Sequence, residues 1–207
     1  MRPEAAPARD RGARVVLGLA GSPRPHGNSG RLLERFLSGA ASAGAEVEWV
    51  AVAECRIAGC RACDECQRAG ECVVTDDFQT LETRIVRADV IALAAPLFFW
   101  NLPAQVKALV DRSQCQWARK CVLRRELPPS AGGHSRRRGV FLGTGGQPEA
   151  DFGGVLQTVR SFFAVYEADL WANACYSGLD SAGEIEHHPT ALEEAVRLGR
   201  RAVEEPW

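Results

Sequence analysis

Residues 15–29 read VVLGLAGSPRPHGNS, an apolar run that passes directly into a turn rich in Gly, Pro and Ser. An amphipathic stretch from Ser29 to Ala43 follows, and a second apolar run occupies Val47 to Val52. This change from an apolar run to helical periodicity and back predicts a strand, a helix and a second strand.

The rest of the chain repeats the alternation. We expect three further strands, at Val90 to Ala94, Gly139 to Leu142 and Asp169 to Ala172. The helical patterns lie at about Asp77 to Arg87, Pro103 to Arg112, Asp151 to Tyr166 and Thr190 to Val203. Strands separated by helices predict an α/β three-layer sandwich with a five-stranded parallel sheet in the order 2-1-3-4-5. Ligands of such sheets bind at the carboxyl ends of strands one and three, so the loops after Ala20 and Ala94 should form the site.

The first of these loops has the chemistry of a phosphate site. Ser22, Asn28 and Ser29 can donate hydrogen bonds and Arg24 can add positive charge, just before a helix whose N–H groups and dipole attract anions. The loop lacks the Lys of a nucleotide P-loop and the GxGxxG of a dinucleotide site, which favours a phosphomonoester. A plain turn with Ser29 as helix cap stays open as the alternative.

The second loop gathers aromatic residues after a strand that should be buried on both faces. It reads PLFFWN from Pro96 to Asn101. Aromatic rings exposed to water at that place would be unfavourable unless another group buried them. Three arrangements would bury the rings: a flat aromatic ligand, a subunit interface or packing in the core. The glycine-rich loop from Gly143 to Gln147 follows the fourth expected strand and lets a ring system approach the backbone closely.

Four cysteines with the spacing Cys60-x2-Cys63-x2-Cys66-x5-Cys72 form the other distinctive pattern. Such a compact run resembles ferredoxin-type ligand sets more than zinc ribbons, whose CxxC pairs lie farther apart. The run therefore favours a 4Fe–4S cluster, with free thiols and zinc as the alternatives. The other four cysteines of the chain are interpreted as packing residues: Cys55, Cys115, Cys121 and Cys175.

Size and charge narrow the class of protein. The chain has 207 residues and a formal net charge of −1, so we expect no nucleic-acid or membrane partner. It has no long apolar segment and no secretory pattern, which predicts a cytoplasmic protein with reduced cysteines. Residues 1–12 are expected to form a flexible tail, and residues 13–207 one domain with a cysteine-rich loop at 55–76.

A basic segment runs from Arg119 to Arg138 around a Pro/Gly-rich turn. It suggests a solvated charged loop, a clamp for the 2′-phosphate of NADPH, or a docking patch for an acidic partner. Its basic residues are Arg119, Lys120, Arg124, Arg125, Arg136, Arg137 and Arg138.

Taken together, these motifs resemble the NADPH-dependent FMN reductase group of flavodoxin-like proteins and, within it, the iron-sulfur flavoproteins. The resemblance is carried by the loop Gly21 to Ser29, the Cys60 to Cys72 run with Asp76-Asp77-Phe78, the segment Ala95 to Phe99, Lys107 with Asp111-Arg112, and the Thr144 loop. Lys107, Asp111 and Arg112 are interpreted as structural, in ion pairs.

The resemblance implies which residues bind each group. The FMN phosphate would be held by Ser22, Arg24, Asn28 and Ser29. The isoalloxazine would be flanked by Pro96, Leu97, Phe98, Phe99, Trp100 and Asn101, with Thr144, Gly145 and Gly146 at its other edge. The four clustered cysteines would be metal ligands. Phe98 replaces the tyrosine expected in many relatives, which removes a phenolic hydroxyl. No side chain is assigned as a catalytic acid or base, because the cofactor performs the chemistry.

The leading functional hypothesis is an FMN-dependent oxidoreductase, in which NAD(P)H or a reduced partner delivers electrons that pass through FMN to an acceptor. The alternative is a ferredoxin-linked iron-sulfur flavoprotein that transfers electrons without NAD(P)H turnover of its own. The third hypothesis is a metal-stabilised binding module without catalytic turnover. The resemblance also implies a homodimer or homotetramer. Because the cysteine loop follows the second strand, we expect it at the carboxyl edge of the sheet, close to the FMN site.

Overall fold

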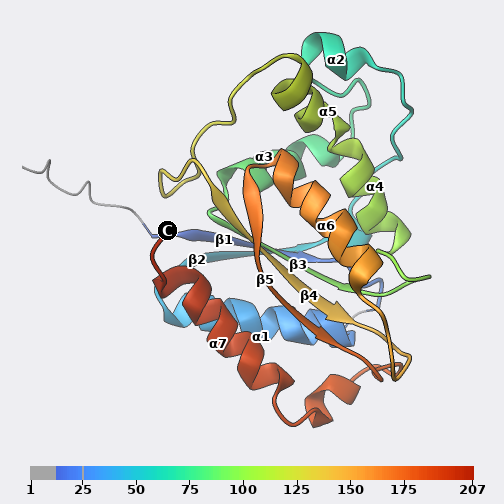
Figure 1. Cartoon of the computed structure of the whole chain (residues 1–207), viewed down its shortest axis with the longest axis vertical. Helices are drawn as coiled ribbons and strands as arrows, with labels where there is room; N and C mark the ends of the chain where they lie inside the picture. Colours follow the sequence, from blue (N-terminus) through green and yellow to red (C-terminus); the bar gives the residue numbers. More distant parts are fainter. Residues whose placement is uncertain (1–12, 25) are drawn as a thin grey trace, which may run out of the picture.

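The computed structural model describes residues 13–24 and 26–207, and the tail expected at 1–12 lies outside the described residues. Its centre is a five-stranded sheet in the order β2-β1-β3-β4-β5 with every neighbouring pair parallel, which confirms the predicted topology (Figure 1). The strands are β1 (Val15–Ala20), β2 (Glu46–Ala51), β3 (Val90–Pro96), β4 (Arg137–Thr144) and β5 (Ala168–Tyr176).

Helices cover both faces of the sheet (Figure 1). One face carries α1 (Asn28–Ser42) and α7 (Ala191–Glu204), and the other carries α3 (Phe78–Arg87), α4 (Ala104–Arg112) and α6 (Gly153–Val165). Two cores result, one around Leu33 and Phe36, the other around Phe141 and Phe163. The inner strand β1 is buried at every position because both of its faces are covered, as its unbroken apolar sequence predicts. No helix of the described residues is long and apolar enough to span a bilayer.

Several element bounds differ from those expected. The strand β2 ends one residue early, at Ala51, because the chain turns into a 3₁₀ turn, and β4 and β5 are longer than their apolar centres. The short elements were not predicted: α2 (Glu65–Ala69) inside the cysteine loop, α5 (Gln114–Trp117), the π-helical turn Ala118–Val122 that follows it, and the 3₁₀ turns Val52–Glu54 and Glu184–His187. Gly70 ends α2 with a φ of 81°, a conformation that glycine adopts without strain.

The packing of α1 against α7 depends on two glycines that let the helices approach closely. A Cβ atom on Gly199 would lie 1.9 Å from the carbonyl oxygen of Phe36, and one on Gly39 would lie 2.1 Å from the carbonyl oxygen of Val196. Replacing Gly199 with Ala should therefore destabilise the protein by about 1–3 kcal/mol through overpacking, measured by thermal unfolding. The matched control is Gly30→Ala in α1, where the new Cβ has room, with its nearest neighbour at 3.9 Å, and should not destabilise. A G199A protein as stable as the parent chain would contradict this account.

Candidate flavin site and cysteine loop

The loop between β1 and α1 presents a buried polar atom without a partner. The Oγ atom of Ser29, in the first turn of α1, is buried and makes no hydrogen bond within the described residues. Leaving a hydroxyl buried and unpaired costs about 1–3 kcal/mol, so such groups call for a ligand. Together with the free N–H groups of the first helical turn, this hydroxyl suits an anion. Gly27 leaves room beside it for the Ser22 hydroxyl, because a Cβ at residue 27 would lie 2.6 Å from the Ser22 Oγ.

Asn28 has a different task from the one expected. Its Nδ2 donates to the carbonyl oxygens of Leu179 (3.3 Å) and Ser181 (2.8 Å), and its Oδ1 accepts from the N–H groups of Gly183 (3.0 Å) and Ile185 (3.2 Å). All hydrogen-bonding positions of the amide are thus occupied. The side chain is not free to bind a phosphate; it fastens the 179–185 loop against the start of α1.

Arg24 reaches the same loop. Its Nη1 donates to the carbonyl oxygen of Asp180 at 2.7 Å, and its backbone N–H donates to the Ser22 Oγ at 3.1 Å. The contact brings Asp180, which the sequence did not single out, to the edge of the site. A Cβ on Gly146 would lie 2.7 Å from the Asp180 Oδ1, so glycine is needed there for the carboxylate to fit.

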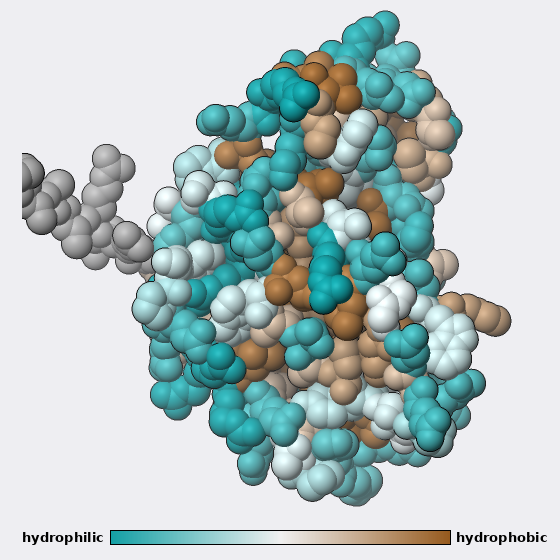
Figure 2. Space-filling view, in the orientation of Figure 1, coloured by the Kyte–Doolittle hydropathy of each residue, from teal (hydrophilic) through white to brown (hydrophobic). Residues whose placement is uncertain are grey.

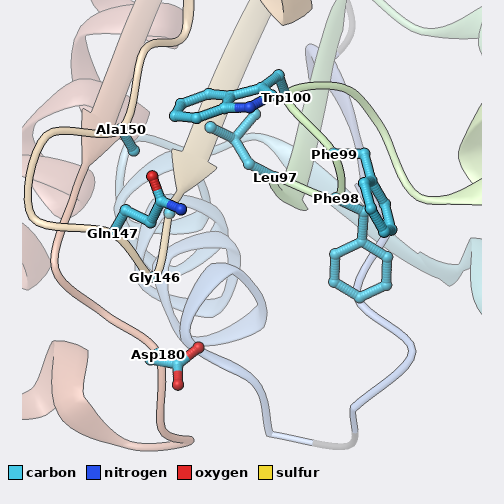
Figure 3. A pocket seen from close by; sticks show the side chains of 9 residues that line it. Leu97, Phe98, Phe99, Trp100, Gly146, Gln147, Ala150 and Asp180 are labelled. Carbon is cyan, nitrogen blue, oxygen red and sulfur yellow. The ribbon is translucent and has the colours of Figure 1, made fainter.

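Two adjoining cavities lie at the carboxyl edge of the sheet. The larger, of about 500 Å³, is lined by Leu97, Phe98, Phe99, Trp100, Gly145, Gly146, Gln147, Ala150 and Asp180 (Figure 3). The smaller, of about 80 Å³, is lined by Ser22, Pro23, Arg24, Gly27, Asn28, Ser29, Pro96, Leu97, Phe98, Thr144, Gly146, Leu179 and Asp180. They share Leu97, Phe98, Gly146 and Asp180, and so form one site with a small polar end and a broad apolar end.

Most of the predicted flavin residues therefore meet here. The exception is Asn101, which lines neither cavity: its Oδ1 accepts from the N–H of Leu102 at 2.8 Å, and its backbone closes a turn. Gln147, Ala150, Leu179 and Asp180 line the site without having been predicted. No sequence signal pointed to the last two, because the fifth strand was expected to end at Ala172, whereas it continues to Tyr176 and brings the following loop to the site.

The aromatic loop is a tight turn in an unusual conformation. Phe98 and Asn101 exchange backbone hydrogen bonds of 2.9 and 3.0 Å, and Phe99 and Trp100 between them have φ values of 48° and 62°. Turns with two positive φ values usually hold Asn-Gly, so two bulky residues here store strain. The turn leaves the Phe99 side chain fully exposed. Figure 2 shows apolar side chains projecting from the edge of the molecule where Figure 1 draws this loop.

The cysteine loop joins β2 to α3. Cys60 and Cys63 are exposed, whereas Cys66 and Cys72 are half-buried against the core. Burial raises the pKa of the Cys66 thiol, and the charges of the Cys60, Cys72 and Cys63 thiols raise it further. Within residues 13–24 and 26–207, no three His, Cys, Asp or Glu side chains are gathered as ligands of one metal ion.

The backbone of this loop has features that suit a cluster. The N–H of Ala62 donates to the Cys60 Sγ at 3.5 Å, and Ala62 and Asp64 adopt left-handed φ values of 50° and 59°. Alternating left-handed residues can form a concave nest of N–H groups, which recurs at iron-sulfur sites. The donor set and its surroundings therefore fit a thiolate-bound cluster.

The basic segment does not form a clamp at the flavin site. Its later residues lie at the start of β4, the end of the sheet opposite the cavities: Arg136 pairs with Glu167 and Asp169, and the buried Arg137 donates to the carbonyl oxygens of Val86 and Pro128. Lys120, earlier in the segment, also pairs with Glu167. The segment is thus not one solvated loop throughout, because Arg137 and Arg138 are buried, although Arg124, Arg125 and Arg136 are exposed. None of its residues lines either flavin cavity, so their positions do not support an NADPH clamp there, and the docking patch stays a prediction.

Other members of the segment contact the cysteine loop. Arg119 donates to the carbonyl oxygen of Gly70 and forms an ion pair with Glu82, and Arg125 donates to the carbonyl oxygen of Ala69. Lys107 pairs with Asp111 and Arg112 with Asp76, each at 2.7 Å, which confirms the predicted ion pairs.

The expected proximity of the cysteine loop to the flavin site is not found within the chain. None of the cavity-lining residues belongs to the loop. In Figure 1, α2 lies at one end of the molecule, beyond α4 and α5, away from the loops that follow β3 and β4. The reason is that the loop runs back along the α3–α4 side and packs on α5 and the π-helical turn.

Thiol reactivity should separate the cysteine loop from the packing cysteines. Burial raises the pKa of the Cys175 thiol to about 11, and burial together with the nearby Glu82 carboxylate raises that of Cys115. Because the thiolate is the reactive form, both should resist iodoacetamide at pH 8 in cluster-free protein, whereas the exposed Cys60 and Cys63 should be alkylated. Peptide mass spectrometry gives the comparison. Alkylation of Cys115 as fast as that of Cys60 in folded protein would contradict it.

A doubly wound sheet of this order, with a phosphate-type loop after β1 and an apolar cavity between the loops after β3 and β4, defines a flavodoxin-like protein. The chain belongs to the NADPH-dependent FMN reductase family, whose model matches residues 15–164. An iron-sulfur flavoprotein of Methanocaldococcus jannaschii is 30% identical over 91% of this chain and 95% of its own length.

Solved structures show the same fold. An NAD(P)H:quinone oxidoreductase from Methanothermobacter marburgensis superimposes with a TM-score of 0.65 and 20% identity, over 94% of this chain and 98% of its own. A flavone reductase gives a TM-score of 0.66 and 20% identity over 92% of this chain, which spans 62% of that longer protein. Family membership supports an oxidoreductase that uses FMN.

Proposed function

We propose that this chain is an FMN-dependent oxidoreductase that passes electrons from NAD(P)H or a reduced partner through FMN to an acceptor. The observation that carries the proposal is the buried, unpartnered Ser29 hydroxyl at the polar end of a site whose other end is broad and apolar. A phosphate and a flat ring joined by a polyol chain match these two ends.

The roles of the residues follow from their places. Ser22, Ser29 and the first N–H groups of α1 bind the phosphate, and Arg24 adds charge while holding the 179–185 loop. Leu97, Phe98, Trp100 and the Gly145-Gly146 backbone enclose the ring and exclude water. Asp180, at the junction of the two cavities, offers acceptors to polyol hydroxyls. Bound FMN supplies the exchange of electron pairs and single electrons, so no side chain must act as acid or base.

We further propose that Cys60, Cys63, Cys66 and Cys72 hold a 4Fe–4S cluster. Their spacing, the N–H donated to the Cys60 sulfur and the left-handed residues between them support it, as does the similarity to a protein called an iron-sulfur flavoprotein. The cluster supplies one-electron transfer. Free thiols and a zinc site are the alternatives that metal analysis separates.

One observation favours the alternative of a ferredoxin-linked electron-transfer protein. Cys60 and Cys63 are exposed at an end of the molecule that the flavin cavities do not occupy. A protein partner of ferredoxin type could therefore reach the cysteine loop without blocking a small-molecule acceptor at the flavin.

The deciding experiment is an absorption spectrum of anaerobically purified protein with iron and sulfide analysis, followed by addition of NADPH or NADH alone. Rapid bleaching of the flavin by a nicotinamide supports the reductase. Bleaching only by a reduced ferredoxin supports the alternative, and protein that cannot take up FMN contradicts both.

Assembly and location stay predictions. A homodimer or homotetramer is supported by the exposed Phe99 and Trp100 at the tip of the aromatic turn, which a second copy of the chain would cover. A cytoplasmic location and the absence of nucleic-acid and membrane partners rest on composition alone.

A further inference from the structure

A buried arginine joins the two ends of the cysteine loop. Arg112, the last residue of α4, has a side chain with 0% exposure. Its Nη1 donates to the carbonyl oxygen of Ala58 at 3.0 Å, before Cys60, and its Nη2 donates to that of Val74 at 2.7 Å, after Cys72. One guanidinium therefore holds the chain on both sides of the four cysteines.

Asp76 completes this arrangement. Its Oδ2 accepts from the Arg112 Nη1 at 2.7 Å and from the N–H of Ala58 at 2.9 Å, and its Oδ1 accepts from the N–H of Phe78 at 3.0 Å. The Phe78 ring lies 4.8 Å from the guanidinium carbon. The planar guanidinium is thus fixed by donors, charge and ring stacking together, which a lysine could not reproduce.

The charge of Arg112 lies beside a proposed cluster ligand. Its Nη2 contacts the carbonyl oxygen of Val74, which lies only two residues after Cys72 in the chain. The Nε atom is buried and has no hydrogen-bond partner among the described residues.

We propose that Arg112 is a positioning residue for the cysteine loop, which closes the loop and places a fixed positive charge beside Cys72 that raises the reduction potential of the bound cluster. The inference rests on the proposed function, in which Cys72 is a cluster ligand. A thiolate-bound cluster becomes more negative when it accepts an electron, so a nearby cation stabilises the reduced form. Asp76 has the opposite sign of charge and partly offsets this effect.

The test uses the opposite charges of Arg112 and Asp76. In anaerobically reconstituted protein, the midpoint potential of the cluster is measured by titration with dithionite, followed by electron paramagnetic resonance. We expect Arg112→Gln to lower the potential and Asp76→Asn, which keeps an amide oxygen for Arg112, to raise it. Arg112→Lys keeps the charge and should shift the potential less than Arg112→Gln.

Arg137 provides the matched control. It is equally buried and also has an unpartnered Nε, but the carbonyl oxygens to which it donates belong to Tyr166, Val86 and Pro128, outside the cysteine loop. Arg137→Gln should reduce thermal stability and leave the potential unchanged.

A second measurement needs no cluster. Hydrogen exchange of residues 56–76 in cluster-free protein should be faster in both Arg112 variants, because neither keeps the three hydrogen bonds of the guanidinium. Arg112→Lys loses the hydrogen bonds that close the loop but keeps the positive charge. This variant therefore separates the two effects of Arg112.

The possible results distinguish a failure of the role proposed for Arg112 from a failure of the proposed cluster. Unchanged potentials, or shifts in the same direction for Arg112→Gln and Asp76→Asn, overturn the role of Arg112 and leave the cluster in place. If Arg112→Gln does not fold, the upward shift of Asp76→Asn is still required. Parent protein that binds FMN but takes up no iron overturns the cluster and this inference together.

Discussion

Replacing Ser29 with Asp should release FMN from the protein. The substitution removes the buried hydroxyl that lacks a partner and puts a carboxylate at the phosphate end of the site. A hydrogen bond to a charged group contributes about 1.5–3 kcal/mol, and repulsion between carboxylate and phosphate adds to its loss. We expect the affinity for FMN to fall by at least about 100-fold, measured by flavin fluorescence on titration of flavin-free protein. Ser29→Ala, without the repulsion, should have a smaller effect.

The matched control is Ser38→Asp, which adds the same charge to an exposed position of the same helix, away from the cavities. It should bind FMN as the parent chain does. Equal FMN affinity in the Ser29→Asp and Ser38→Asp proteins would show that the phosphate binds elsewhere.

The sheet could be predicted from the sequence because its signal is strong and repeated. Buried parallel strands must be apolar on both faces, as β1 and β3 are, and each is followed by a helix with one apolar side. Strand ends were less clear. Arg137 and Arg138 look like a solvated run, yet they extend β4, because backbone carbonyls accept from both and the rings of Trp171 and Trp207 stack on Arg138.

The sequence predicted those parts of the candidate site in which the type of a residue alone indicates what it can bind. Ser22, Arg24, Ser29 and the aromatic loop lie together as expected, since the carboxyl ends of adjacent strands meet. The sequence could not show that the Asn28 amide is used up by the 179–185 loop, because that contact joins segments about 150 residues apart. Asp180 was missed for the same reason.

The surroundings of the cysteine loop illustrate the same limit. The spacing of the cysteines is a local pattern and can be read directly. The arginines that support the loop come from positions 112, 119 and 125, and their role appears only when the fold brings them to the carbonyls at 58, 69, 70 and 74. A basic run is therefore ambiguous until its partners are known.

Substitution of the clustered cysteines should abolish iron binding. We expect about four iron and four sulfide per chain in anaerobically reconstituted protein, and loss of most of both on single replacement of Cys60, Cys63, Cys66 or Cys72 by Ser. A cube with three protein ligands is less stable, and the serine hydroxyl is a poor substitute for a thiolate. Iron and sulfide analysis with the absorption spectrum gives the readout, and FMN content should remain near that of the parent, because the loop lines neither flavin cavity.

Cys55 is the control for this series, because it precedes the four clustered cysteines and has its own partner. Its Sγ donates to the carbonyl oxygen of Ala51 at 3.5 Å, and burial raises the pKa of its thiol, so it should stay a protonated packing residue. Cys55→Ser should keep the full iron content. Equal iron loss in Cys55→Ser would mean that the ligand set is not the one that the spacing indicates. Parent protein that binds one zinc per chain and no sulfide would replace the cluster with a zinc site, since a mononuclear zinc site contains no inorganic sulfide.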